Sequence, residues 1–245
     1  MADNAMVWER PEPPERPSLG PLSRERIVTA AMTLADGEGL EAVSIRKVAG
    51  VLDVGPMRLY RYVDTKEELL ELMVDAVYAE IPAPTGTSWR AILRSYATGK
   101  REAVLAHEWF ADLLGGRPKL GPSTLAHSES ILSALRAAPD LDGVDAVMSA
   151  FEVLAVFVDG AVRKEVTERR LERSTGQDKA EWQAAAGPYL ERMLATGRYP
   201  ALDEVVREAT HHDAAAVFEL GLDYLLDGIE ARLPSSRSGH SSVDQ

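Results

Sequence analysis

The side chains best suited to chemistry lie between Ser44 and Lys66, and the chemistry they suit is contact with nucleic acid. This stretch holds five basic and two acidic side chains, within a chain of 245 residues whose formal net charge is -12. Arginine presents a planar fork that matches guanine edges and phosphates, and tyrosine hydroxyls can donate to phosphate oxygens. A basic island on an acidic protein is the electrostatic footprint of a small DNA-binding module. The residues predicted to contact DNA are Ser44, Arg46, Lys47, Gly55, Pro56, Met57, Arg58, Tyr60, Arg61, Tyr62 and Lys66.

Two short helices joined by a tight turn are predicted to position these side chains. Ser44 is suited to cap the first helix, and Pro56 is suited to open the second. In the first helix the small side chain of Ala49 allows the second helix to approach closely. In the second, of about two turns, Leu59 and Val63 face inward at a spacing of four. We expect phosphates to be bound by Arg46, Lys47 and Lys66. Base edges are expected to be contacted by Met57, Arg58 and Arg61. Bracing against the DNA backbone is expected from Tyr60 and Tyr62.

Residues 22 to about 81 resemble the N-terminal domain of the TetR (tetracycline repressor) family of bacterial transcription regulators. The resemblance is carried by Ile27-Val28-x-Ala30-Ala31, Ser44-Ile45-Arg46-Lys47-Val48-Ala49 and Leu59-Tyr60-Arg61-Tyr62-Val63-x-x-Lys66-x-x-Leu69-Leu70. Asp53 stands in the turn where the family usually has glycine; because left-handed backbone costs Asp less than most residues, we expect the turn to form. The resemblance implies a ligand-responsive repressor, which binds a near-palindromic DNA operator as a homodimer and is released by a small organic molecule.

The expected fold class is all-α, with an N-terminal three-helix helix-turn-helix domain and a larger helical domain for ligand binding and dimerisation. Residues 88–233 show helical periodicity without the alternation of strands. Ser23, Thr65, Ser88 and Asp213 are expected to start helices. The expected division is a disordered arm at 1–21, a DNA-binding domain at 22–81, a regulatory domain at 86–233 and a disordered tail at 234–245. The absence of cysteine and the shortness of every apolar run predict a cytoplasmic protein.

A pocket for a small organic effector is expected between helices of the regulatory domain. Its candidate lining residues are aromatic side chains and one histidine: Tyr96, His107, Trp109, Phe110, Phe151, Phe157, Trp182 and Tyr189. The tetracycline repressor itself coordinates a drug-bound magnesium through a histidine ahead of a Gly-x-Arg-Pro run. Here the corresponding run is Leu113-Leu114-Gly115-Gly116-Arg117-Pro118, which places leucine there. A magnesium-bound tetracycline is therefore not expected as the effector. No metal site, cofactor or catalytic residue is predicted.

The last predicted helix carries Gly221 and Gly228 seven residues apart on one face. Glycine inside a helix costs about 1 kcal/mol relative to alanine, so two in one stripe favour close approach of another helix. An ordinary core helix is the alternative. By resemblance, this helix and the long helix at about 143–173 pair with their two-fold mates in a four-helix dimer interface. The predicted interface residues are Phe151, Ala155, Val158, Val217, Leu220, Gly221, Tyr224, Leu225 and Gly228.

Two other classes of protein remain as alternatives, a helical protein-binding adaptor and a small-molecule-binding enzyme without a role on DNA. The sequence holds no glycine-rich phosphate loop, no nucleophile elbow and no His-Glu-x-x-His motif, which argues against the enzyme. The basic hairpin argues against an adaptor that uses the acidic domain to bind proteins.

Overall fold

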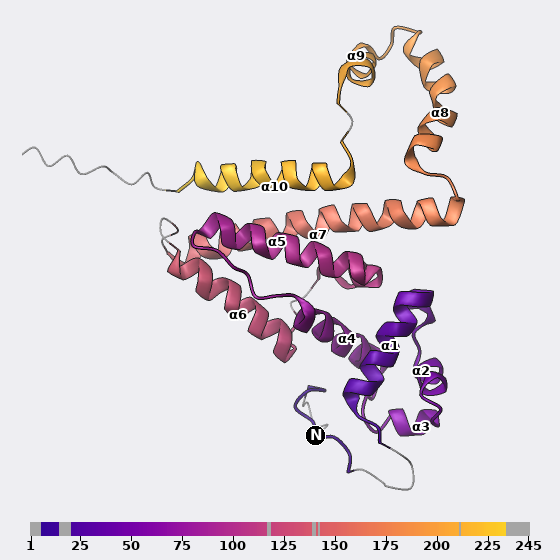
Figure 1. Ribbon diagram of the computed structural model, residues 1–245, viewed down its shortest axis with the longest axis vertical. Helices are drawn as coiled ribbons and strands as arrows, with labels where there is room; N and C mark the ends of the chain where they lie inside the picture. Colours follow the sequence, from indigo (N-terminus) through magenta and orange to yellow (C-terminus); the bar gives the residue numbers. More distant parts are fainter. Residues whose placement is uncertain are drawn as a thin grey trace, which may run out of the picture.

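The computed structural model of the protein describes residues 6–14, 21–116, 119–138, 141, 143–210 and 212–233. Within these residues every regular element is a helix, which confirms the predicted fold class (Figure 1). The predicted disordered tail lies outside the described residues, as do Arg117 and Pro118. No helix in the described part of the chain combines the length and the apolar character needed to cross a membrane.

The N-terminal helices enclose a small apolar core. They are α1 (Arg24–Glu38), a 3-10 turn η2 (Leu40–Ala42), α2 (Ile45–Val51), α3 (Pro56–Leu59) and α4 (Lys66–Glu80). Ile27 and Ala31 of α1, Ala49 of α2, Leu59 of α3 and Val63 are each fully buried. The inward pattern of the sequence is therefore confirmed, and α4 leads from this core into the second group of helices (Figure 1).

The second group of helices packs around the long helix α7. Its elements are α5 (Trp89–Ala106), η3 (Glu108–Leu113), α6 (Pro122–Ala137), α7 (Val144–Thr175), α8 (Lys179–Leu194), α9 (Pro200–Glu208) and α10 (Ala214–Glu230). Helix α7 has 32 residues, a length of about 48 Å at 1.5 Å per residue. Helices α5, α6 and α10 all pack against α7, and α4 packs against α6 (Figure 1).

Residues 6–14 are ordered where the sequence predicts a disordered arm. Val7 is buried, and Arg10 forms ion pairs with Asp64 and Glu68 beside the start of α4. Nη1 of Arg24 donates to the carbonyl of Arg10 at 2.6 Å. The prediction is wrong for these residues because one apolar side chain and one arginine find partners that composition cannot reveal.

An aspartate of α4 fixes the start of α6. Oδ1 of Asp75 accepts from the backbone N of Thr124 at 2.8 Å and from its Oγ1 at 3.0 Å, and Oδ2 accepts from the N of Ser123 at 3.2 Å. The N-cap of α6 is Gly121, which has no side chain to accept a hydrogen bond. Asp75 thus satisfies the free N–H groups of the first turn. This contact ties the helix that leaves the N-terminal core to the helices around α7.

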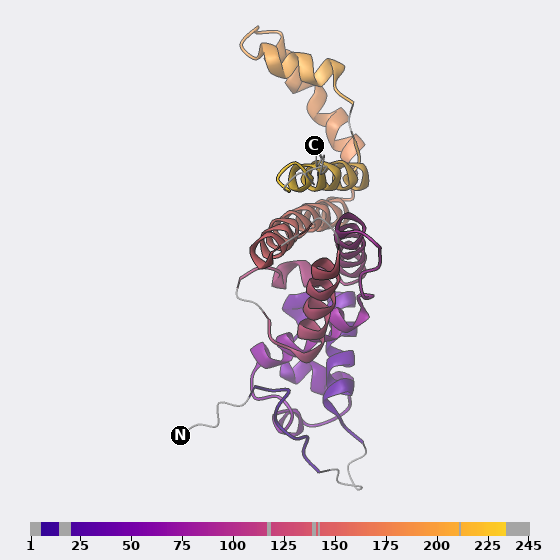
Figure 2. The ribbon, with the colours of Figure 1, turned by 90° about the vertical axis from the view of Figure 1, so that its left-hand side faces the viewer.

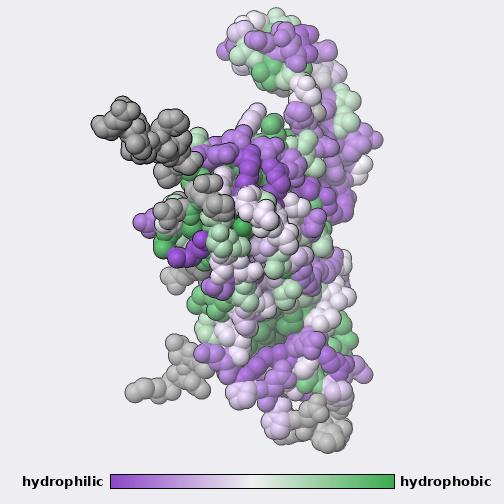
Figure 3. All heavy atoms as spheres, turned by 60° about the vertical axis from the view of Figure 1, so that its left-hand side comes forward, coloured by the Kyte–Doolittle hydropathy of each residue, from purple (hydrophilic) through white to green (hydrophobic). Residues whose placement is uncertain are grey.

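Helices α8 and α9 project from the end of α7 before the chain returns as α10 (Figures 1 and 2). The sole buried residue of α8 is Leu194, and α9 buries none. Figure 3 shows this projection standing clear of the rest of the surface, with hydrophobic residues among hydrophilic ones. The large apolar side chains exposed on the projection are Trp182, Tyr189, Tyr199, Leu202 and Val205.

Candidate functional site

The helix-turn-helix forms with the predicted caps and turn. Oγ of Ser44 accepts from the backbone N of Lys47 at 3.2 Å and caps α2. Gly55 is the N-cap of α3, and Pro56 occupies its first position. Asp53 lies in the left-handed region with a φ of 53°. The prediction that Asp53 would tolerate this backbone is confirmed.

The recognition helix is shorter than predicted. Its α-helical part spans only Pro56–Leu59, and tighter turns follow. In these turns the backbone N of Arg61 donates to the carbonyl of Arg58 at 3.3 Å, and the N of Tyr62 donates to the carbonyl of Leu59 at 2.8 Å. Bonds to the third residue back tighten the chain relative to an α-helix. Tyr62 follows Leu59 by three residues and shares its buried face, a spacing that the prediction overlooked.

Tyr62 is a core residue. Its exposed fraction is 5%, and its hydroxyl donates to the carbonyl of Leu22 at 2.8 Å. Nε of Arg24 donates to the carbonyl of Tyr62 at 3.1 Å. The prediction that Tyr62 braces against the DNA backbone is therefore wrong. The residue instead attaches the recognition hairpin to the start of α1.

The remaining predicted DNA contacts form a basic surface on the hairpin. Met57, at 76% exposed, is the most exposed large apolar residue in the part of the chain that the structure describes. Lys47 pairs with Glu38 at the end of α1, and Lys66 is half-buried at the first position of α4. The exposed members of this surface are Ser44, Arg46, Lys47, Gly55, Pro56, Met57, Tyr60 and Arg61, with Arg58 half-buried among them.

A second candidate site lies where rings from α4, η3, α5, α6 and α7 meet. The ring of Tyr96 lies 5.8 Å from that of His127 and 5.5 Å from that of Phe151, between centroids. The ring of Tyr78 lies 5.8 Å from His127 and 5.6 Å from Phe110. We call these five residues the aromatic cluster. It unites three of the predicted pocket residues, Tyr96, Phe110 and Phe151.

A cavity of about 140 Å³ adjoins the aromatic cluster. Two members of the cluster, Tyr78 and Phe110, form part of its wall. The other lining residues come from α4, from η3 and the loop after it, and from α7: Val74, Leu113, Leu114, Gly115, Gly116, Lys119 and Asp159. The cavity therefore combines aromatic walls with one carboxylate, of Asp159, and one amine, of Lys119.

A buried ion pair lies behind this cavity. Lys100 is 3% exposed, and its Nζ lies 2.6 Å from Oδ1 of Asp159 and 3.4 Å from the hydroxyl of Tyr96. Burial alone would lower the pKa of Lys100, but Tyr96, Tyr78 and Asp159 outweigh it and raise that pKa above its ordinary value. The amine is thus charged at neutral pH. Sequence reasoning missed Lys100, although it follows Tyr96 by four residues on the buried face of α5.

His127 supplies an unpaired nitrogen to the same region. The residue is 7% exposed, and among the described residues its Nε2 has no hydrogen-bond partner. Burial, and then the charge of Lys100, lower the pKa of His127, so the imidazole is neutral at physiological pH. Sequence reasoning missed His127 too. The available signal was its place on the buried face of α6, three residues after Thr124 and four before Ile131.

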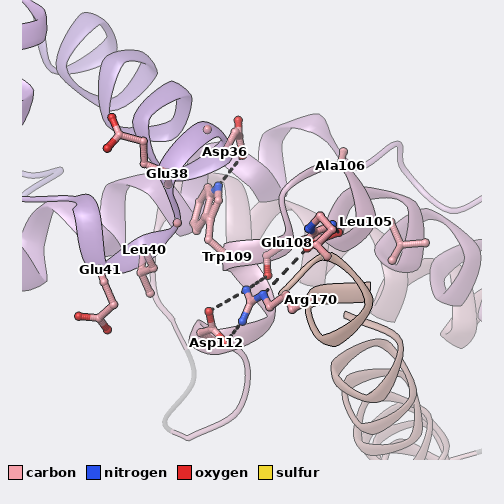
Figure 4. Close-up of a pocket in the computed structure, with 14 residues that line it drawn as sticks. Asp36, Glu38, Leu40, Glu41, Leu105, Ala106, Glu108, Trp109, Asp112 and Arg170 are labelled. Atoms are coloured by element: carbon pink, nitrogen blue, oxygen red, sulfur yellow. Dashed lines mark hydrogen bonds and ion pairs between the residues drawn. The ribbon is translucent and has the colours of Figure 1, made fainter. Parts of the chain in front are cut away.

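His107 and Trp109 lie at the junction between the N-terminal helices and the helices around α7, outside the aromatic cluster. Nδ1 of His107 lies 2.8 Å from Oδ1 of Asp36 in α1, and its Nε2 lies 2.9 Å from Oε2 of Glu80 in α4. Nε1 of Trp109 donates to the same oxygen of Asp36 at 2.7 Å (Figure 4). Burial lowers the pKa of His107, but the hydrogen bonds and charges of Asp36 and Glu80 outweigh it and raise that pKa. Both residues therefore link the N-terminal helices to the helices around α7.

A larger cavity of about 740 Å³ borders this junction, between α1 and the helices α5 and α7 (Figure 4). Nη1 and Nη2 of Arg170 each lie 2.9 Å from a carboxylate oxygen of Asp112, and Nη2 also donates to the carbonyl of Glu108 at 2.7 Å. Arg173 pairs with the carboxylate of Glu108. Because carboxylates and their arginine partners form much of its wall, this cavity suits an apolar effector less well than the cavity beside the aromatic cluster.

Besides His107 and Trp109, three more predicted pocket residues lie away from the aromatic cluster. Phe157 packs on Phe218 of α10, with ring centroids 5.7 Å apart. Trp182 and Tyr189 are exposed on α8. Their assignment to one pocket is wrong, because α8 does not fold back onto the helices around α7.

The outward faces of α7 and α10 carry most of the predicted dimer residues. Val217, Leu220, Tyr224 and Gly228 are exposed, and Phe151, Ala155, Gly221 and Leu225 are partly buried. Val158 is wrong as an interface residue, because it is fully buried within the protomer. The exposed position on that turn of α7 is Val156, at 74%. A groove of about 600 Å³ runs between these faces and includes Val153, Tyr224 and Gly228.

The described residues contain no group of three or more His, Cys, Asp or Glu side chains placed to hold a metal ion. The Leu113-Leu114 position, where the tetracycline repressor has its magnesium-binding histidine, instead belongs to the wall of the smaller cavity.

A helix-turn-helix joined through α4 to a larger helical domain defines a class of transcriptional regulators. The family model of the tetracyclin repressor-like C-terminal domain matches residues 81–233. The HTH-type transcriptional repressor DrrR1 of Streptomyces coeruleorubidus is 37% identical over 240 residues, which cover 97% of this chain and 87% of DrrR1. The class E tetracycline repressor protein of Escherichia coli is 27% identical over 230 residues, 91% of this chain and 97% of that protein. The crystal structure of ActR from Streptomyces coelicolor in complex with actinorhodin matches with a TM-score of 0.73 and 28% identity, over 88% of this chain and 98% of ActR. The chain belongs to the tetracycline-repressor family of transcriptional regulators.

Proposed function

We propose that the protein is a cytoplasmic transcriptional repressor that binds a near-palindromic DNA operator as a homodimer. A small organic effector, bound within the regulatory helices, releases it from DNA. The observation that carries the proposal is the basic surface of the hairpin, which stands out on a protein of net charge -12. The repressor name of DrrR1 and the complex of ActR with actinorhodin support it. The role is regulatory, without a catalytic step.

Two copies of the hairpin are needed for this function. One short recognition helix reaches few base pairs, whereas a two-fold dimer reads two half-sites about one helical turn of DNA apart. The apolar faces of α7 and α10 favour such pairing, because exposed apolar side chains in one stripe mark an interaction surface. Val153 and Val156 on α7 and Val217, Leu220 and Tyr224 on α10 form this stripe.

The experiment that tests the function is selection of bound duplexes from a random DNA pool at two salt concentrations. We expect a near-palindrome, bound with an affinity that falls steeply with salt because each phosphate contact contributes about -0.9 to the slope of log K against log salt. In titrations of the selected duplex, Arg61→Ala should weaken binding at least tenfold. The matched control is Arg198→Ala, which removes an exposed arginine between α8 and α9.

The alternatives give different results in the same experiment. If the protein were a helical adaptor or a small-molecule-binding enzyme, the selection would recover no duplex above background at either salt concentration. Adding cell extract as a source of effectors would not lead to recovery of a duplex. Binding that is lost equally in Arg61→Ala and Arg198→Ala would mean that net charge, and not the hairpin, holds the DNA.

A further inference from the structure

We propose that Met57 reads the methyl group of one thymine in each half-site of the operator, and that the protein therefore prefers thymine to cytosine at that position. The inference rests on the proposed function and names the base that one side chain selects.

The side chain of Met57 points away from the protein core. Its exposed fraction is 76%, whereas Leu59, two residues further along α3, is fully buried. Residues two apart in a helix are separated by about 200° around its axis, so the buried Leu59 fixes the opposite direction for Met57. The backbone N of Arg58 donates to the carbonyl of Gly55 at 2.9 Å and closes the turn that carries Met57.

The residues before Met57 leave it unobstructed. Gly55 and Pro56 are both exposed, and a Cβ added at Gly55 would meet nothing within 4 Å. In helix-turn-helix proteins the first residues of the recognition helix contact base edges in the major groove. We call Gly55, Pro56 and Met57 the apolar tip of the hairpin, and this tip is the part of the hairpin that reaches the bases.

The apolar tip has almost no means of reading a base through hydrogen bonds. Glycine has no side chain, proline lacks a backbone N–H, and the methionine sulfur is only a weak acceptor. Bases present donors and acceptors in the major groove, and the apolar group among them is the C5-methyl of thymine. Methionine is flexible and polarisable, so it can adapt its shape to a methyl group. The chemistry of the apolar tip therefore matches thymine.

The surroundings of the apolar tip favour DNA over a protein partner. Arg46, Lys47 and Arg61 are exposed on the same hairpin, with Arg58 half-buried, and the phosphates of DNA complement their charge. A stable protein interface buries about 800 Å² on each partner, which a single exposed methionine among cations does not offer. The cations supply attraction to the duplex, and Met57 adds discrimination at one base pair.

The test removes the methyl group of thymine and leaves every other atom of the base pair in place. In the duplex recovered by selection, each thymine is replaced in turn by deoxyuridine, at equivalent positions of both half-sites. Fluorescence anisotropy then measures the affinity of the full-length protein. At one position we expect the replacement to weaken wild-type binding roughly fivefold or more, because two methyl groups lose their apolar contact.

Variants of Met57 assign this loss to its side chain. Met57→Ala should bind the thymine and deoxyuridine duplexes equally at that position, whereas Met57→Leu, which keeps a long apolar side chain, should retain the preference. The matched control is Val51→Ala, which removes a side chain that is 55% exposed at the end of α2 in the same hairpin. It should respond to deoxyuridine as the wild type does. Urea unfolding of Met57→Ala should match that of the wild type, because the side chain lies outside the core.

The outcomes separate this inference from the proposed function. An operator without thymine in its half-sites, a wild type indifferent to every thymine methyl, or a Met57→Ala protein that keeps the wild-type response at every position would overturn the inference and leave the DNA-binding function intact. Loss of the response in Val51→Ala as well would assign it to the shape of the hairpin and would also overturn the inference. Recovery of no duplex would contradict the proposed function and the inference together.

Discussion

Tyr60 and Tyr62 stand two residues apart in the recognition hairpin and have different surroundings. Tyr60 is exposed, whereas the hydroxyl of Tyr62 is buried on the carbonyl of Leu22. We expect Tyr62→Phe to lower the free energy of unfolding by about 1 kcal/mol, the usual worth of one internal hydrogen bond. Tyr60→Phe should leave stability unchanged and weaken operator binding, as measured by urea unfolding and DNA titration. The same loss of stability in both variants would contradict the assignment of Tyr62 to the core and of Tyr60 to the DNA-binding surface.

Gly221 and Gly228 form a matched pair on α10. A Cβ at Gly221 would lie 2.7 Å from Cε2 of Phe157, whereas one at Gly228 would meet nothing within 4 Å. Alanine gains up to about 1 kcal/mol over glycine in a helix, and overpacking costs about 1–3 kcal/mol. We therefore expect Gly228→Ala to stabilise the protein and Gly221→Ala to destabilise it relative to Gly228→Ala, in denaturant unfolding at equal protein concentration. Equal effects would mean that Phe157 moves aside freely.

At the scale of elements, the junction of α1 and α4 with the end of α5 depends on a histidine. Because Asp36 and Glu80 raise the pKa of His107, the folded state holds its proton more tightly than the unfolded state does. The stability that this provides is fully present below the ordinary histidine pKa of about 6.5. It is lost as the pH rises through the higher pKa of the folded protein.

His107→Asn should therefore destabilise the protein most at acidic pH. We expect the difference in unfolding free energy between wild type and His107→Asn to be largest near pH 6 and to shrink by pH 8.5. Urea unfolding at the two pH values measures it, with His212→Asn as the exposed control. A difference that does not change with pH would show that His107 acts only through packing.

Helix starts could be predicted because capping is local. Ser23, Ser44, Thr65, Ser88 and Asp213 each accept a hydrogen bond from the backbone of the third residue on. The buried face of α1 could be predicted for the same reason, because the apolar residues that form it recur at helical spacing within one short segment. These features depend on neighbours along the chain.

Features that depend on distant partners could not be predicted. Arg10 becomes ordered through Asp64 and Glu68, more than fifty residues away. Lys100 and His127 are polar residues on otherwise buried helix faces, and only the packing of α5 and α6 shows that both lie beside Tyr96. The sequence therefore indicated where the basic surface lies, whereas the buried polar side chains of Lys100 and His127 were found only in the three-dimensional arrangement.

At the scale of the whole molecule, the stripe on α7 and α10 determines whether two hairpins act together. Val156 is 74% exposed in the single chain, and burying a valine contributes about 1.5 kcal/mol or more. We expect Val156→Asp to dissociate the dimer in sedimentation experiments and to weaken operator binding at least tenfold. Leu125→Asp, on an exposed leucine of α6, is the control. A Val156→Asp protein that remains dimeric would place the interface elsewhere.

The chain reaches α10 through the projecting helices α8 and α9, but the contacts that hold α10 lie outside that projection. Phe218 packs on Phe157 of α7, and Arg90 and Arg94 of α5 pair with carboxylates along α10. A protease that cut the exposed projection would leave α10 seated as a separate polypeptide. The folded structure therefore does not depend on an unbroken chain at this point. After such a cut, a denaturing gel would show two fragments, while a native gel would show one particle.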